Sequence, residues 1–234
     1  MKKYSVWVVG MIFLGLGAMV AQAAPPYQVG EKWVYKQNGP RPWGPPDSAV
    51  TGDRVREVVS TEGSGADQRW LVKETWGGDD NNPSQFYFDE KKAVNKLVVG
   101  ERMVIQYVPP MPFDFSSLKP GEEKTTEIQS KVGDAGDSNG FPVKVIAKRL
   151  PDATVKVPAG EFTDCVHVEM QTIITFKNDQ GEVKISMKQE IFTHSKVNGA
   201  VKETFTFEPT KFGDQERKGY TSTSELKEYT AQKK

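Results

Sequence analysis

The first residues whose chemistry could define a function are Cys165, His167 and Glu169, which occupy alternate positions of a predicted strand. A thiol, an imidazole and a carboxylate on one strand face form a candidate zinc site or a nucleophile–base pair. However, residues two apart on a strand are separated by roughly 6.6 Å, so three in succession splay instead of converging on one ion. We therefore interpret Cys165 as a buried, inert thiol and predict no metal site here.

The other catalytic patterns are weaker still. His194 adjoins Ser195, but adjacent strand residues point to opposite faces, which argues against a Ser–His contact. The acidic run at residues 79–82 lacks the 12-residue frame of a calcium loop and is typical of a solvated turn. No Gly-rich phosphate loop and no Gly-x-Ser-x-Gly motif occurs. The sequence thus predicts a non-enzymatic protein with no catalytic residue, no metal and no cofactor.

Apolar binding is the chemistry that remains. Residues 109–115 carry large apolar side chains, yet their prolines remove backbone donors and exclude the segment from a sheet interior. Such a segment crosses the open end or face of a sheet, where it could lid a pocket for an acyl chain or a similar ligand. The alternative is a flap that only closes the core. The candidate ligand-binding residues are Met111, Phe113, Phe115, Trp33 and Trp70.

Short apolar runs separated by Gly, Pro and polar turns position these residues. Trp70, Val72 and Trp76 share one face of a predicted strand, and in the preceding strand Arg54 and Arg56 are assigned to the solvent side. The runs recur at a spacing typical of antiparallel sheets. We predict an all-β fold with a large curled antiparallel sheet, a half-barrel or open barrel, and at most one or two short helices.

The clearest structural signal lies at residues 155–168, which read as strand, tight turn and strand. Pro158 presets φ for the first corner of a turn, and Gly160 supplies the left-handed conformation that closes a three-residue hairpin loop. The sequence therefore predicts a central hairpin with positive φ at Gly160.

The N-terminus has the pattern of an export signal. Lys2 and Lys3 precede an uncharged apolar stretch, and the small residues ending at Ala23 fit a signal peptidase site. The apolar stretch is shorter than the roughly 20 residues of a spanning helix, and two prolines follow it. We predict a signal peptide at residues 1–23 and a single exported β domain at residues 24–234, periplasmic or extracellular, with no integral membrane anchor after cleavage.

The charge balance is close to neutral. The chain has 31 basic and 31 acidic residues, and loss of the two lysines in the signal leaves 31 − 2 = 29 basic residues against 31 acidic ones. A net charge near −2 creates no global field that favours nucleic acid or an anionic membrane. We therefore predict no nucleic-acid partner.

Three motifs carry a resemblance to a known family. They are Gly-Glu-Lys-Trp-Val-Tyr at residues 30–35, Val-Pro-Ala-Gly-Glu-Phe-Thr-Asp-Cys at residues 157–165, and Lys-Val-Asn-Gly-Ala-Val-Lys at residues 196–202. Their order and spacing resemble uncharacterised exported bacterial β proteins with a domain of unknown function, sometimes labelled TapB-like. The resemblance implies a curled antiparallel sheet, similar to the half-barrel of periplasmic lipoprotein carriers of the LolA/LolB type. It brings no catalytic residues with it.

Two functional hypotheses follow. The first is an envelope protein that binds an apolar small molecule, a lipid or a lipidated partner on the concave face of the sheet. The second is a structural or assembly module of the cell envelope that acts through protein–protein contacts at a sheet edge or at the flap.

Overall fold

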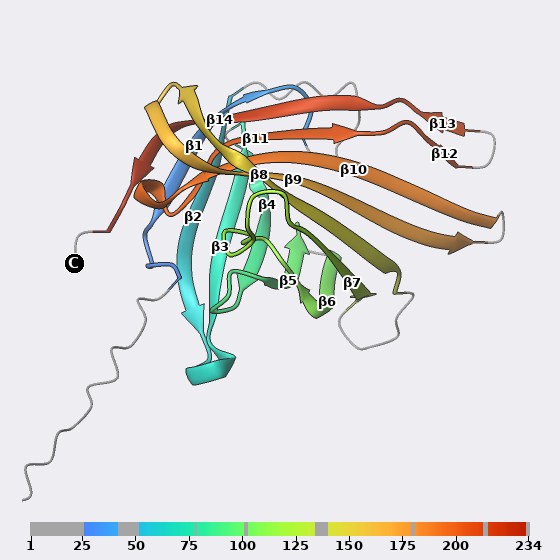
Figure 1. Ribbon diagram of the computed structural model, residues 1–234. Helices are drawn as coiled ribbons and strands as arrows, with labels where there is room; N and C mark the ends of the chain where they lie inside the picture. Colours follow the sequence, from blue (N-terminus) through green and yellow to red (C-terminus); the bar gives the residue numbers. More distant parts are fainter. Residues whose placement is uncertain are drawn as a thin grey trace, which may run out of the picture.

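A computed structural model describes residues 26–41, 52–77, 79–100, 103–133, 140–178, 181–212 and 215–232. The predicted signal peptide lies outside these residues. The described part of the chain is almost entirely antiparallel β structure, as predicted (Figure 1). Its helical elements are two single-turn 3₁₀ segments, η1 (Gly65–Asp67) and η2 (Ser195–Val197).

Twelve strands close into one barrel, and two short ones form a separate ribbon. Around the barrel the neighbours follow the order β1, β14, β11, β10, β9, β8, β7, β6, β5, β4, β3 and β2. The strands are β1 (Lys32–Asn38), β2 (Asp53–Glu62), β3 (Arg69–Trp76), β4 (Asp79–Phe88), β5 (Val94–Val99), β6 (Met103–Met111), β7 (Glu123–Val132), β8 (Pro142–Val157), β9 (Gly160–Asn178), β10 (Gly181–His194), β11 (Gly199–Phe207), β12 (Thr210–Phe212), β13 (Gln215–Arg217) and β14 (Tyr220–Thr230).

The barrel is closed by its first and last strands. β1 pairs with β2 on one side and with β14 on the other, from Lys32 opposite Thr230 to Asn38 opposite Thr223. The sequence predicted a curled sheet in the form of a half-barrel or open barrel, whereas in the structure the sheet forms a closed barrel. Closure pairs the two edges that a sheet of this size would otherwise leave free, which is the physical reason for it.

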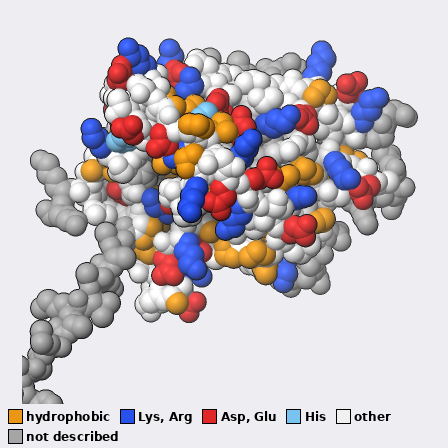
Figure 2. Space-filling model, in the orientation of Figure 1, with side chains coloured by type: hydrophobic (Ala, Val, Ile, Leu, Met, Phe, Trp, Pro, Cys, Tyr) orange, Lys and Arg blue, Asp and Glu red, His pale blue; other side chains and the backbone are white. Residues whose placement is uncertain are grey.

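The core lies inside the barrel and follows the two-residue alternation of the strands. Trp33 and Tyr35 of β1, and Trp70 and Val72 of β3, all point inward and are buried. Figure 2 shows acidic and basic side chains interspersed across one face of the outer surface, with hydrophobic side chains between them. Aromatic and branched side chains buried in this way supply the main stabilisation of such a fold.

The predicted central hairpin is formed by β8 and β9. Gly160 has φ +131°, which confirms the predicted positive φ. The loop is tighter than predicted: Val157 pairs directly with Gly160, so two residues connect the strands instead of three. The tip of the hairpin is fixed to the opposite side of the barrel, because the amide of Ala159 donates a 2.9 Å hydrogen bond to the carbonyl of Leu226 in β14.

Replacing Gly160 with valine is expected to destabilise the fold by more than the roughly 1 kcal/mol of an ordinary Gly-to-Ala change. No atom lies within 4 Å of a Cβ built at this position, so the cost comes from the positive φ and not from a clash. Thermal melts of Gly160→Val and of the exposed neighbour Ala159→Val check this. Equal melting temperatures for wild type and Gly160→Val would refute it.

Candidate functional site

The five predicted ligand-binding residues meet in one apolar cluster at one end of the barrel. Trp33, Trp70, Met111 and Phe115 are all buried, with at most 8% of each residue exposed, and Phe113 is partly buried against the same cluster. Residues far apart in the sequence are therefore brought together.

Aromatic contacts organise this end of the barrel. Phe88 of β4 lies at its centre: its ring is 5.9 Å from that of Phe113 and 5.3 Å from that of Tyr27. Tyr27 also meets Trp33 edge-on at 6.1 Å. Such offset and edge-to-face pairs are favourable beyond their buried area. The N-terminal segment and the flap thus pack against the same ring.

The flap, residues 109–115, departs in part from the prediction. The prolines were expected to keep it out of the sheet, but β6 continues through Pro109 and Pro110 to Met111, which pairs with Val94 of β5. The strand tolerates the prolines because its ladder with β7 has already ended at Val108. After Met111 the flap leaves the sheet. Its Phe115 carbonyl accepts a 3.1 Å hydrogen bond from the amide of Leu118, within the same loop.

Side-chain hydrogen bonds connect the first and third motifs of the family resemblance. The indole of Trp33 donates a 2.6 Å hydrogen bond to the carbonyl of Val197, and the hydroxyl of Tyr35 donates a hydrogen bond to the carbonyl of Ala200. The Asn198 amide donates to both oxygens of the buried Glu31 carboxylate at 3.2 Å. These contacts join the first motif to the third and give the motifs a structural role.

A buried ionic cluster lies deeper in the barrel and was missed by the sequence analysis. Arg54 is 1% exposed, and Glu74 and Glu203 are each 4% exposed. The Arg54 guanidinium donates to Glu74 at 2.8 and 2.9 Å and also bonds Glu203. Arg56 reaches the same two carboxylates, at 2.6 and 3.5 Å. The assignment of Arg54 and Arg56 to the solvent side is therefore wrong.

The cluster ties the N-terminal strands to the C-terminal strands across the closing seam. Arg54 of β2 also donates to the Ser224 hydroxyl of β14 at 3.1 Å. Gln37 of β1 hydrogen bonds both Ser222 and Ser224 of β14. Two arginines and two glutamates balance in charge, which burial requires. The cluster therefore links β2 and β3 to β11 and β14 without leaving an unpaired charge.

The surroundings of the cluster set its protonation. Burial alone would raise the pKa of Glu74, but the adjacent Arg54 and Arg56 outweigh burial and hold this pKa below its ordinary value. The pKa of Glu203 is lowered by the same balance. Burial, with Glu203 nearby, raises the pKa of Tyr35, so its hydroxyl stays protonated. Both carboxylates are ionised and engaged as partners of arginine.

Strand alternation contained the signal for this cluster. Glu74 falls between Val72 and Trp76 on the inward face of β3, and Glu203 precedes Phe205 on the inward face of β11. A charged residue in an inward register position indicates a buried partner of opposite charge. The identity of that partner could not be read from the sequence, because Arg54 and Glu203 are 149 positions apart.

The Cys165, His167 and Glu169 set does not gather into a site. Cys165 is fully buried, as predicted, and burial raises the pKa of its thiol. Next to Cys165 the ladder between β8 and β9 is irregular, so the alternation of buried and exposed residues along β9 changes phase. After Cys165 the buried residues are Val168 and Met170, not His167 and Glu169. The predicted single face for the three residues is therefore wrong. His167 bonds Glu190 at 2.9 Å instead.

Metal and membrane features are not found in the described residues. No group of three or more His, Cys, Asp or Glu side chains among them is arranged to hold a metal ion. None of the helices in that part of the chain has the length and hydropathy needed to span a bilayer.

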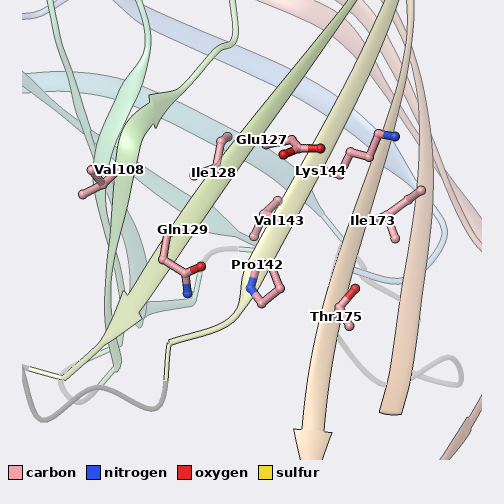
Figure 3. Close-up of a pocket in the computed structure, with 9 residues that line it drawn as sticks. All are labelled: Val108, Glu127, Ile128, Gln129, Pro142, Val143, Lys144, Ile173 and Thr175. Carbon is pink, nitrogen blue, oxygen red and sulfur yellow. The ribbon is translucent and has the colours of Figure 1, made fainter.

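A pocket of about 450 Å³ opens on the barrel wall across β6, β7, β8 and β9. Figure 3 shows the lining residues on neighbouring strands, with Val108 on β6 and Ile128 and Gln129 on β7. Most of the lining residues are exposed or half-buried, so the pocket lies on the outer side of the wall. Its lining is Val108, Glu127, Ile128, Gln129, Pro142, Val143, Lys144, Ile173 and Thr175.

Comparison with known proteins defines the fold. No protein-family model matches the chain, and no curated protein is similar to it in sequence. The TapB-like and LolA/LolB-type resemblance is thus not confirmed and stays a prediction.

Among solved structures, the chain is similar to a predicted exported protein with a YmcC-like fold from Bacteroides fragilis. The TM-score is 0.50 at 14% sequence identity, over 88% of this chain and 98% of that one. A second similar structure is a predicted lipoprotein from Parabacteroides distasonis, with a TM-score of 0.38 at 12% identity, over 88% of this chain and 97% of that one. The first likeness shows a shared fold.

Proposed function

We propose that this is a non-enzymatic exported protein of the cell envelope that binds an apolar, lipid-like ligand or a lipidated partner beneath the flap. The export pattern at residues 1–23 supports the location, as does the fold shared with a predicted exported protein. The ligand class follows from the aromatic and branched side chains gathered at one end of the barrel.

The observation that carries the proposal is how the flap covers this end. Phe113 and Phe115 insert their side chains into the apolar cluster, while the local backbone hydrogen bond of Phe115 stays within the flap loop. A cover attached mainly by side chains can lift without breaking a strand ladder. Lifting it would expose Phe88, Trp33 and Trp70 to an incoming acyl chain.

The packing of the flap side chains against the core is compatible with this proposal. In the described structure the flap side chains occupy the space that the ligand would take, so binding exchanges one set of apolar contacts for another. Burying each Phe side chain contributes roughly 1.5–3 kcal/mol, and a long acyl chain supplies about 0.8 kcal/mol for each buried methylene. Two phenylalanines are therefore matched by about four to seven buried methylenes, so a longer acyl chain would displace them favourably.

The test is the double variant Phe113→Ala with Phe115→Ala, measured by thermal melting and by uptake of a dansylated fatty acid. Phe115 is buried and Phe113 partly buried, so the double variant is expected to lose several kcal/mol of stability in either case. Probe uptake is therefore the deciding measurement: if the flap is a lid, we expect probe affinity to change at least fivefold.

Phe207→Ala is the matched control. Phe207 is buried in a separate cluster with Met187 and Phe205, so its replacement should lower the melting temperature and leave probe uptake unchanged. No probe binding by the wild type or the flap variant would show that the flap is only a core plug.

The second candidate function is an assembly module that acts through protein–protein contacts. One observation favours it: part of β7 has no ladder partner on one side, although the barrel is otherwise closed. A stable protein partner in pull-down experiments, together with a purified protein free of lipid, would favour this function over ligand binding.

A further inference from the structure

Strand β7 has a free edge in the barrel wall. Its ladder with β6 covers only Ile105–Val108 opposite Gln129–Val132, whereas on its other side it pairs with β8 from Glu123 onward. Residues 123–128 therefore have no ladder partner on the β6 side. Alternate backbone amides and carbonyls along this edge point away from β8 and have no ladder partner.

The chemistry of the next residues explains the gap. Pro109 and Pro110 follow Val108 in β6, and proline has no backbone N–H with which to continue a ladder. Within residues 103–133, no backbone hydrogen bond of the flap loop reaches this edge. The amide of Gly121 bonds the carbonyl of Arg149, and that of Glu122 bonds Lys119.

Burial supports an accessible edge. Glu123, Lys124 and Thr125 are all exposed, although successive residues point to opposite faces of the strand. Both faces of residues 123–125 therefore meet solvent, whereas Thr126 is half-buried and Ile128 is buried. The 450 Å³ wall pocket begins beside the last pair of the ladder, Val108 and Gln129, and also includes Glu127 and Ile128 (Figure 3).

We propose that residues 123–128 of β7 bind an extended segment of a partner protein as an added antiparallel strand. Main-chain hydrogen bonds to the free edge would supply the attachment, and the wall pocket would receive a partner side chain. This site lies outside the apolar end beneath the flap, and its test is independent of lipid binding.

The charges on the edge select against a second copy of this chain. If two copies paired antiparallel with Thr125 opposite Thr125, Glu123 of each copy would lie opposite Glu127 of the other. If they paired with Thr126 opposite Thr126, Lys124 of each copy would lie opposite Ile128 of the other. Like charges directly opposite one another are destabilising. The fitting occupant is instead a segment with basic residues opposite both glutamates and an acidic residue opposite the lysine.

The probe is the acetylated and amidated peptide Val-Lys-Thr-Thr-Glu-Lys, which is complementary to residues 128 to 123 in antiparallel order. The control peptide, Val-Glu-Thr-Thr-Lys-Glu, has its charges reversed. We expect the complementary peptide to bind the mature protein at least tenfold more tightly, and to slow hydrogen exchange of the amides at residues 123–128.

Two variants make the result decisive. Exchanging the charges with Lys124→Glu and Glu127→Lys leaves the net charge unchanged, and the preference should shift toward the control peptide. Replacing Pro109 and Pro110 with valine and threonine restores the missing N–H groups, so β6 can pair along β7 and should exclude both peptides. Absent protection at residues 123–128, or protection unchanged by either variant, would overturn the proposal.

Discussion

Replacing Arg54 with alanine is expected to lower the free energy of unfolding by about 3–5 kcal/mol, because it leaves buried carboxylates without their main partner. Glu74 and Glu203 are each 4% exposed, and Arg56 would remain as the single cation beside the two carboxylates. For a domain of this size the loss corresponds to a fall of about 10 °C in melting temperature. Urea unfolding followed by tryptophan fluorescence measures it.

The control is an ion pair of the same type at the surface. Lys202 and Glu225 lie 3.1 Å apart on neighbouring strands and are partly exposed, so Lys202→Ala should cost less than about 1 kcal/mol. If Arg54→Ala were as mild as Lys202→Ala, the ionic cluster would not hold the seam between β1 and β14.

Acid is expected to destabilise the barrel through the same cluster. The pKa values of Glu74 and Glu203 are lower in the folded protein than in the unfolded chain. Their stabilisation is therefore complete above the unfolded value of about 4.3, and it is lost as the pH falls through the folded values. Each group contributes up to about 1.4 kcal/mol per pH unit within that window.

To check this expectation, the free energy of unfolding is measured as a function of pH for the wild type and for the double variant Glu74→Gln, Glu203→Gln. The double variant should start less stable at pH 7 and lose less stability between pH 5 and pH 3. A wild-type profile that is flat across this range would contradict the lowered pKa values, as would identical slopes for the two proteins.

The sequence was sufficient for the features that depend on local pattern. The inward face of Trp70, Val72 and Trp76, the positive φ of Gly160 and the burial of Cys165 are all confirmed. Each follows from alternation, turn chemistry or residue type within a few positions. The all-β class follows from the same signals repeated along the chain.

Features that depend on distant partners could not be predicted in the same way. Arg54 and Arg56 were assigned to solvent because isolated arginines are mostly exposed, and their partner Glu203 lies on a strand near the other end of the chain. Closure of the barrel likewise depends on pairing of the first strand with the last. Local alternation along β9 failed where the ladder beside Cys165 is irregular.

The candidate ligand site was predicted by residue type, and its members prove to be neighbours. Trp33, Trp70, Met111, Phe113 and Phe115 were chosen as large apolar residues on strands and on a Pro-rich flap, and the fold gathers them into one cluster. The free edge of β7 was not predicted, because it depends on where the ladder with β6 stops. The prolines at 109 and 110 were the signal for it.

Lipid extraction followed by mass spectrometry of the purified mature protein tests the central claim most directly. Binding beneath the flap predicts an apolar, lipid-like molecule that co-purifies with the wild type and is reduced in the Phe113→Ala, Phe115→Ala variant. The same lipid content in both proteins would contradict a site under the flap. A protein that carries no apolar molecule, and takes up none when incubated with envelope lipids, would contradict the proposed function itself.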